Sequence, residues 1–285
     1  MSRHPVCLIV VALLTACKSE APSPATTATA SSAVTASEPA ARATAVASAS
    51  GGGASKVEES TDLYEFDYSY PAEAGRIPAL KAWLDSERDK ARKQLIEDAT
   101  AGRAEAKESG FEYHPYASGR AWDKVTETPR FLSLSAQIYD YSGGAHPNHG
   151  TDSLLFDKQE GTRLAPLDLF ASKAAFDAVI RQPFCALLDK ERGKRRGEPV
   201  VRDKGMFDDC IKPSEQTVIL GSSNGRTFDR VGVLVGPYAA GSYAEGDYEF
   251  TLPVTAGLLK AVKPEYREAF SVRSFLPILR SQMGR

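Results

Sequence analysis

The fold is decided by the stretch Tyr64-Glu65-Phe66-Asp67-Tyr68-Ser69-Tyr70, in which an aromatic residue occupies every second position. Side chains alternate between the two faces of a β-strand, so this spacing predicts a strand with one buried and one exposed face. The apolar period then lengthens, because leucines and alanines recur at helical spacing between residues 77 and 102, with charges on the opposite face. We therefore expect a strand that leads into a long amphipathic helix.

The rest of the globular part continues this mixture of strands and helices. Further strands are predicted at residues 130–141, 151–156, 217–220, 231–235 and 248–252. A second helix is expected over residues 172–192, kinked at Pro183, and Thr255 is expected to cap a short helix. The pair Asn224-Gly225 predicts a tight hairpin turn, because both residues tolerate positive φ. These elements indicate an α+β fold: an antiparallel sheet packed with a long N-terminal helix and a second, mid-chain helix.

The N-terminus has the pattern of a secretion signal. Residues 1–16 combine Arg3 with an apolar run that is too short to span a bilayer, which predicts a cleaved signal peptide. Leu14-Thr15-Ala16-Cys17 resembles the bacterial lipobox, so we expect Cys17 to be lipidated and to attach the protein to a membrane. The alternative is an ordinary signal peptide that ends near a chance cysteine. Lys18, rather than an aspartate, favours the outer membrane, with the protein facing the periplasm.

Residues 17–60 are rich in Ala, Ser, Thr, Pro and Gly and contain no aromatic residue. Such a segment buries too little apolar surface to fold, so we expect a disordered tether between lipid and globular part. The whole chain has 35 Lys and Arg against 37 Asp and Glu, a net charge of −2. This balance argues against nucleic acid as a partner.

Two cysteines remain in the globular part, Cys185 and Cys210. In an oxidising compartment we expect them to form a disulfide, and two unpaired thiols are the alternative. Between them, residues 190–204 carry an excess of positive charge. This stretch is expected to be either a solvated helix end or a contact for anionic wall polymers.

Three motifs resemble catalytic or metal-binding signatures without the partners that these need. Gly221-Ser222-Ser223-Asn224-Gly225 matches a nucleophile elbow, but no histidine follows it. Met206-Phe207-Asp208-Asp209-Cys210 resembles the Asp-Asp motif of polysaccharide deacetylases, which also requires downstream histidines. His146 and His149 are too few ligands for a metal site. We therefore expect no catalytic residue, no metal and no cofactor.

Tyr141-Ser142-Gly143-Gly144-Ala145-His146-Pro147-Asn148-His149, with Leu167-Asp168-Leu169-Phe170 further on, resembles part of a known domain pair. Its first member is the PdaC-type domain, which a bacterial peptidoglycan deacetylase carries N-terminal to its catalytic domain. Pro237-Tyr238 and Gly241-Ser242-Tyr243-Ala244-Glu245-Gly246 resemble the second member, the RsiV-like domain of a lysozyme-sensing anti-sigma factor. The resemblance implies a PdaC-like part at residues 61–160 and an RsiV-like part at residues 161–285, packed as one unit.

The resemblance implies a non-catalytic, extracytoplasmic module associated with cell-wall enzymes or with lysozyme recognition. The deacetylase catalytic domain and the sigma-binding segment have no counterpart here, so we expect only the outward-facing, receptor-like part. Our leading hypothesis is a lipid-anchored envelope protein that binds peptidoglycan or a lysozyme-like muramidase.

The candidate binding surface is formed by glycine-rich turns, which leave backbone groups and aromatic edges accessible. Its residues are Tyr141, Gly143, Gly144, His146, His149, Tyr238 and Tyr243. Two alternatives remain open. One is a wall-glycan hydrolase or deacetylase-related enzyme with His146 or His149 as base, and the other is a structural envelope spacer.

Overall fold

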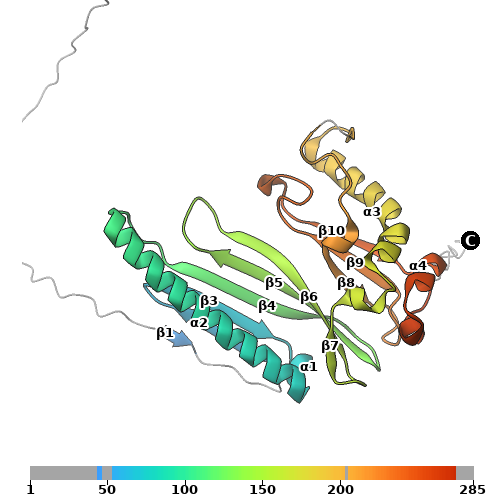
Figure 1. The fold of residues 1–285 in the computed structure, drawn as a ribbon, viewed down its shortest axis with the longest axis horizontal. Coiled ribbons are helices and arrows are strands. Elements are labelled where there is room, and N and C mark those ends of the chain that lie inside the picture. Colours follow the sequence, from blue (N-terminus) through green and yellow to red (C-terminus); the bar gives the residue numbers. More distant parts are fainter. Residues whose placement is uncertain (1–43, 47–52, 203–204, 274–285) are drawn as a thin grey trace, which may run out of the picture. The chain divides into compact units, whose positions relative to one another are not determined.

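The computed structural model describes residues 44–46, 53–202 and 205–273 (Figure 1). The strands in these ranges are β1 (Thr44–Val46), β2 (Ser55–Ser60), β3 (Tyr64–Tyr70), β4 (Tyr116–Glu127), β5 (Phe131–Tyr141), β6 (Asn148–Asp157), β7 (Thr162–Leu164), β8 (Thr217–Gly221), β9 (Arg230–Val235) and β10 (Tyr248–Pro253). The helices are α1 (Ala72–Gly75), α2 (Pro78–Ser109), α3 (Lys173–Arg196) and α4 (Ala256–Ala261). The predicted signal peptide, Cys17 and most of the predicted tether lie outside the described residues. Within the described ranges no helix is both long enough and apolar enough to cross a membrane.

The larger sheet contains seven strands in the order β1-β2-β3-β4-β5-β6-β7. Neighbouring strands are antiparallel except β3 and β4, which are parallel and pair Tyr64 with Tyr116 and Tyr68 with Arg120. A parallel pair needs a crossover connection, and α2 provides it. The predicted antiparallel sheet with a long helix is confirmed, with this one parallel pair.

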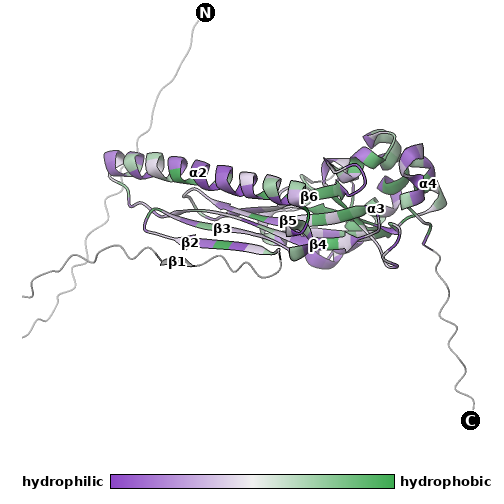
Figure 2. Ribbon diagram, turned by 90° about the horizontal axis from the view of Figure 1, so that it is seen from below, coloured by the Kyte–Doolittle hydropathy of each residue, from purple (hydrophilic) through white to green (hydrophobic). Residues whose placement is uncertain are grey.

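Helix α2 lies along one face of the larger sheet (Figure 2). The four aromatic side chains of β3 point at this helix and are buried against a stripe of its residues: Leu80, Leu84, Leu95 and Ala99. Full burial of one large apolar side chain stabilises a fold by roughly 1.5–3 kcal/mol. The aromatic face of β3 and the apolar stripe of α2 therefore form one hydrophobic core.

The predicted end of this helix near residue 102 is wrong, because α2 continues to Ser109. Gly102 does not stop the helix. A Cβ at this position would lie 2.2 Å from the Tyr116 hydroxyl oxygen, so the glycine permits the close approach of β4. The helix ends at Gly110, whose φ of 72° is left-handed.

The predicted boundary of the tether at residue 60 is also wrong, because β2 covers Ser55–Ser60. This strand has little apolar surface and pairs along its whole length with β3. Its Glu59 binds Arg92 of α2 at 2.8 Å and accepts a hydrogen bond from the Tyr64 hydroxyl at 2.6 Å. Backbone pairing and these polar contacts, rather than burial, hold the strand at the sheet.

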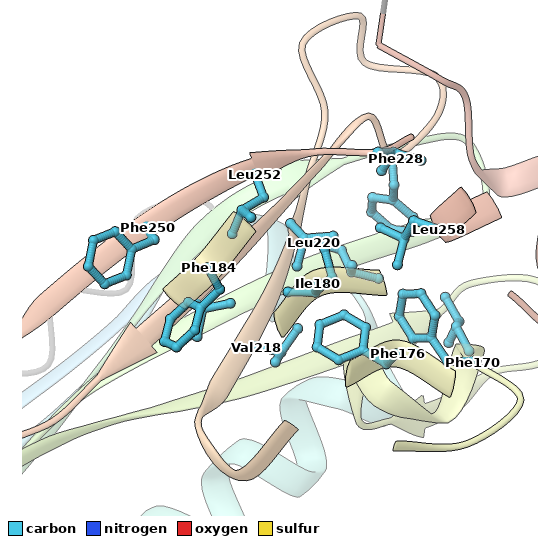
Figure 3. Packing of buried hydrophobic residues seen from close by; sticks show 14 of the residues in the cluster. Phe170, Phe176, Ile180, Phe184, Val218, Leu220, Phe228, Phe250, Leu252 and Leu258 are labelled. Atoms are coloured by element: carbon cyan, nitrogen blue, oxygen red, sulfur yellow. The ribbon is translucent and has the colours of Figure 1, made fainter. Parts of the chain in front are cut away.

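The smaller sheet contains three strands in the order β10-β9-β8, and helix α3 packs on it. Figure 3 shows Phe176, Ile180 and Phe184 of α3 facing Val218 and Leu220 of β8. Phe131 and Leu155 of the larger sheet belong to the same hydrophobic cluster. The second predicted helix is confirmed; it continues through Pro183 to Arg196.

The strands β8 and β9 form the predicted hairpin, but the predicted tight Asn-Gly turn is wrong. Residues 222–229 separate the two strands, and of the pair only Gly225 has a positive φ, at 66°. The Asn224 side chain instead accepts hydrogen bonds from the backbone N–H groups of Arg226 and Thr227 at 2.7 and 2.9 Å. An asparagine that bonds its own downstream backbone forms a longer turn.

Cys185 of α3 and Cys210 form a disulfide, as the sequence predicted, with their Cα atoms 5.5 Å apart. The bridge ties the middle of α3 to the segment that precedes β8. Covalent closure restricts the unfolded chain much more than the folded one, which is the main source of its stabilising effect.

Replacing both cysteines by alanine is expected to lower the free energy of unfolding by about 3 kcal/mol, because the bridged residues are 25 positions apart. Urea unfolding of the wild type and of the double variant measures the difference. Reduced wild type serves as the control and should unfold at the midpoint of the variant. Equal midpoints for the oxidised wild type and the variant would contradict the expectation.

Candidate functional site

The connection between β5 and β6 contains the first part of the predicted binding surface, and we call residues 141–149 the glycine loop. Gly143 and Gly144 have φ values of 88° and 98°, which other residues rarely adopt. The Tyr141 hydroxyl donates a hydrogen bond to the Gly144 carbonyl at 3.2 Å, which closes the turn. This geometry exposes His146 at the tip of the loop.

The connection between β9 and β10 contains the second part, and we call residues 236–247 the tyrosine loop. The ring of Tyr243 stacks on the ring of His146, with centroids 4.1 Å apart and an interplanar angle of 26°. The Tyr243 hydroxyl also donates a hydrogen bond to the Pro147 carbonyl at 2.9 Å. The structure therefore brings together the two loops that the sequence singled out.

Tyr238 has the most unusual backbone in this site. With φ at 63°, it is the one residue other than glycine in the described ranges with positive φ. A left-handed conformation costs a residue with a side chain roughly 1–2 kcal/mol. The conformation leaves Tyr238 52% exposed beside Tyr243, with ring centroids 5.8 Å apart. Tyr238, Tyr243 and His146 thus form a row of rings, which we call the aromatic ladder.

Hydrogen bonding fixes both histidines of the glycine loop. His146 Nδ1 donates a hydrogen bond to the Pro147 carbonyl at 2.9 Å, and its Nε2 lies 3.3 Å from the Tyr238 hydroxyl oxygen. His149 Nε2 lies 3.1 Å from Asp247 Oδ1, and its Nδ1 lies 3.4 Å from the Tyr243 hydroxyl. The nitrogens of both rings are thus used within the protein, and the ring faces are left for contact.

Arginines at the C-terminal end of α3 hold the tyrosine loop. Arg192 is fully buried and donates hydrogen bonds to the carbonyls of Ala240 at 2.8 Å and Asp209 at 2.9 Å. Arg195 donates to the carbonyls of Glu245 at 2.6 Å and Asp247 at 2.8 Å. Carbonyl dipoles compensate a buried guanidinium because each supplies a partially negative oxygen.

These contacts correct the interpretation of residues 190–204. The basic stretch was expected to be a solvated helix end or a contact for anionic polymers, whereas its central arginines bind the protein's own loops. Arg192, Arg195 and Arg196 share one face of α3 because helical neighbours are three and four residues apart. That spacing was the signal in the sequence, but nothing in it showed which loop they would meet.

Glu245 completes the support of the tyrosine loop. Its burial raises the pKa of the carboxyl, but hydrogen bonds from Tyr248, Arg196 and the Ser242 N–H outweigh burial and hold the pKa below its ordinary value. Burial and the bond to Glu245 raise the pKa of Tyr248 to about 12. The carboxylate and the phenol are therefore a stable acceptor and donor at neutral pH.

The residues of the catalytic-like motifs have structural partners. Ser223 donates hydrogen bonds to Asp229 inside the β8–β9 turn, and Asp208 binds Arg196 at 2.8 Å. Among the described residues no group of three or more His, Cys, Asp and Glu is placed to hold a metal ion. The pair of His149 and Asp247 is the arrangement here that most resembles acid–base chemistry.

One part of the described chain matches a known family. Residues 57–149 match the family model described as Deacetylase PdaC. This stretch is similar to a PdaC domain. It extends from β2 to the start of β6, so the PdaC-like stretch supplies the glycine loop and the following part of the chain supplies the tyrosine loop.

Solved structures of the DUF3298 family resemble the chain as well. One, from Bacteroides fragilis NCTC 9343, is 16% identical with a TM-score of 0.46, over 75% of this chain and 90% of that chain. Another, from Pseudomonas aeruginosa PAO1, is 14% identical with a TM-score of 0.46, over 77% of this chain and 97% of that chain. No protein with a curated description matches the sequence.

Acid is expected to loosen the tyrosine loop. The pKa of Glu245 in the folded protein is lower than its ordinary value of 4.5. Its stabilising effect is therefore complete above the ordinary value and is lost as the pH falls through the lowered pKa. NMR signals of the Tyr238 and Tyr243 rings, recorded from about pH 6 down to about pH 2, measure the change.

Glu245→Gln is the matched control, because the amide keeps the shape of the side chain and does not titrate. In this variant the tyrosine rings should already be less ordered at neutral pH and should show no further change at the titration of Glu245. An unaltered pH profile in the variant would contradict the assignment.

Proposed function

We propose that this protein is a lipid-anchored envelope protein, held at the outer membrane and facing the periplasm, whose non-catalytic domain recognises a lysozyme-like muramidase. Three features support the location: the lipobox-like Cys17, the PdaC-like stretch and the disulfide, which is typical of oxidising compartments. The observation that carries the recognition is the aromatic ladder, and above all Tyr238.

Tyr238 resembles an anchor residue of a protein interface. Tyrosine is enriched among the few residues that dominate binding energy, because its ring buries a large area at low entropic cost. Here the ring is presented at an energetic cost to the backbone, and strained residues concentrate at functional sites. A muramidase has a cleft shaped for the flat faces of sugar rings, and a protruding aromatic ring matches that shape.

The supports of the ladder suit the same role. Arg195 and the Glu245 side chain hold the tyrosine loop through hydrogen bonds with its backbone. Asp247 holds His149 in the same way through its carboxylate. A loop that is ordered before binding loses less entropy when the partner arrives. The surface is therefore prepared for a partner without a rearrangement of the fold.

A second candidate function is hydrolysis of wall glycan, because His149 and Asp247 are 3.1 Å apart. A carboxylate beside an imidazole is a common acid–base arrangement. Release of soluble fragments from purified peptidoglycan, abolished by His149→Ala, would favour this function over recognition. Retention of peptidoglycan without cleavage would instead favour a wall component as the partner.

The muramidase proposal predicts opposite effects of Tyr238→Gly on stability and on binding. Glycine relieves the left-handed strain, so the free energy of unfolding should rise by about 1 kcal/mol. Loss of the ring should weaken binding to a c-type lysozyme at least about thirtyfold, as expected for an interface anchor. Calorimetry and surface plasmon resonance on the purified chain measure the two effects.

Val272→Ala is the control for binding, because Val272 is 45% exposed but belongs to neither the glycine loop nor the tyrosine loop. It should bind lysozyme like the wild type. Wild-type protein that does not bind lysozyme, or equal binding by Tyr238→Gly, would refute the proposal.

A further inference from the structure

A groove runs between α2 and the strands β4 and β5, on the face of the sheet that the helix covers. It consists of two adjoining hollows of about 310 and about 300 Å³. Both hollows are lined by Ala91, Gln94, Ser118 and Asp140, so they form one continuous depression. We call it the helix–sheet groove. It is lined by Tyr141 but by no residue of the aromatic ladder.

The sequence of α2 leaves this groove open. Large apolar residues of the helix are buried at Leu84 and again at Leu95. Between them, the positions that face the sheet hold Glu87 and Ala91, which are only half-buried. A leucine at position 91 would continue the stripe, because residues four apart lie on the same face. The hollow exists because a small residue replaces a large one at this place.

The lining combines an apolar floor with a polar rim of mixed charge. Phe66, Leu95 and Ile138 belong to the floor, and the rim carries side chains from both the helix and the strands: Glu87, Lys90, Gln94, Asp98, Ser118, Arg120 and Asp140. The rim contains both positive and negative groups, so no strong field of one sign selects a highly charged ligand. Residues 87–98 of the helix span about 16 Å at 1.5 Å per residue, which suits a linear ligand.

Tyr68 supplies an unusual group at the bottom of this groove. Its side chain is 2% exposed, and its hydroxyl forms no hydrogen bond of good geometry within the described residues, although the Trp122 indole lies near it. Burial raises the pKa of Tyr68 to about 12, so the hydroxyl stays protonated. A buried hydroxyl without a partner is uncommon, and a polar ligand in the groove would supply the partner.

We propose that the helix–sheet groove binds an uncharged oligosaccharide. Sugar rings present apolar C–H faces, which match the floor, and hydroxyl groups at their edges, which match the carboxylate, amide and hydroxyl groups of the rim. The hydroxyl of Tyr68 bonds a sugar hydroxyl from below. This site is separate from the aromatic ladder and does not depend on recognition of a muramidase.

Isothermal titration of the full chain with chitotetraose and with cellotetraose tests the proposal. Tyr68→Phe removes only the hydroxyl, so it should weaken binding about threefold to tenfold while the midpoint of thermal unfolding stays the same or rises. Ala91→Leu fills the groove and should abolish measurable binding, again without a lower midpoint. A lower midpoint together with unchanged affinity in Tyr68→Phe would show a structural role and overturn the proposal.

Two controls separate this site from other effects. Ala82→Leu places the same side chain at an exposed position of the same helix and should bind like the wild type. Tyr238→Gly should also keep wild-type affinity for the oligosaccharide, so failure at the ladder and failure at the groove are distinguishable. Absence of binding to both tetrasaccharides, or wild-type affinity in Ala91→Leu, would refute the saccharide site.

Discussion

Burial of the aromatic face of β3 under α2 is the contact on which the larger sheet depends. Helix α2 returns the chain to the end of the sheet at which β3 begins. Strand β4 can therefore lie beside β3 and parallel to it. Every later strand of the sheet adds to β4 in antiparallel order, so the position of the glycine loop follows from this crossover. The same contact also creates the helix–sheet groove, between Leu84 and Leu95, where the helix presents no large apolar side chain to the sheet.

The loops beside the smaller sheet depend on a different kind of contact, the hydrogen bonds of the buried Arg192 guanidinium. Its bonds to Ala240 and Asp209 connect α3 with two loops that are distant in sequence. A charge in the interior is tolerated only when polar atoms surround it. Without its carbonyl partners, the buried guanidinium would destabilise the fold. The carbonyl groups at the C-terminal end of α3 also favour a cation there. Loop position and helix position are therefore set together.

Local patterns in the sequence predicted much of this fold. The alternation in β3, the stripe of α2 and the Thr255 cap of α4, whose side chain accepts from Leu258 N–H, each depend on near neighbours. Strand β4 was not predicted, because its Ser118, Gly119 and Arg120 show no apolar alternation. It forms because strands on both sides supply its hydrogen bonds. Strand β2 was missed for a related reason, since edge strands can be polar.

In the candidate site, too, local features were predictable and contacts between distant segments were not. Gly143 and Gly144 were selected as turn residues, and their positive φ values agree with that selection, whereas Tyr238 was selected for its accessible ring and its positive φ was not predicted. The contact of His146 with Tyr243 and the role of Arg195 join segments that are far apart, and one sequence contains no sign of such pairing. The groove was missed because a hollow results from a side chain that is small where its neighbours are large. Alanine is common in helices, so Ala91 alone does not indicate a groove.

The disulfide between Cys185 and Cys210 makes the stability of the protein depend on the redox state of the compartment in which it folds. Asp209, next to Cys210, accepts a hydrogen bond from Arg192 through its carbonyl oxygen. The disulfide and the buried guanidinium therefore hold the same stretch of chain. Thiols in a reducing compartment stay apart, and a nascent polypeptide there lacks this reinforcement. Under the export that we propose, the chain would cross the membrane without this cross-link and would form it only on the oxidising side.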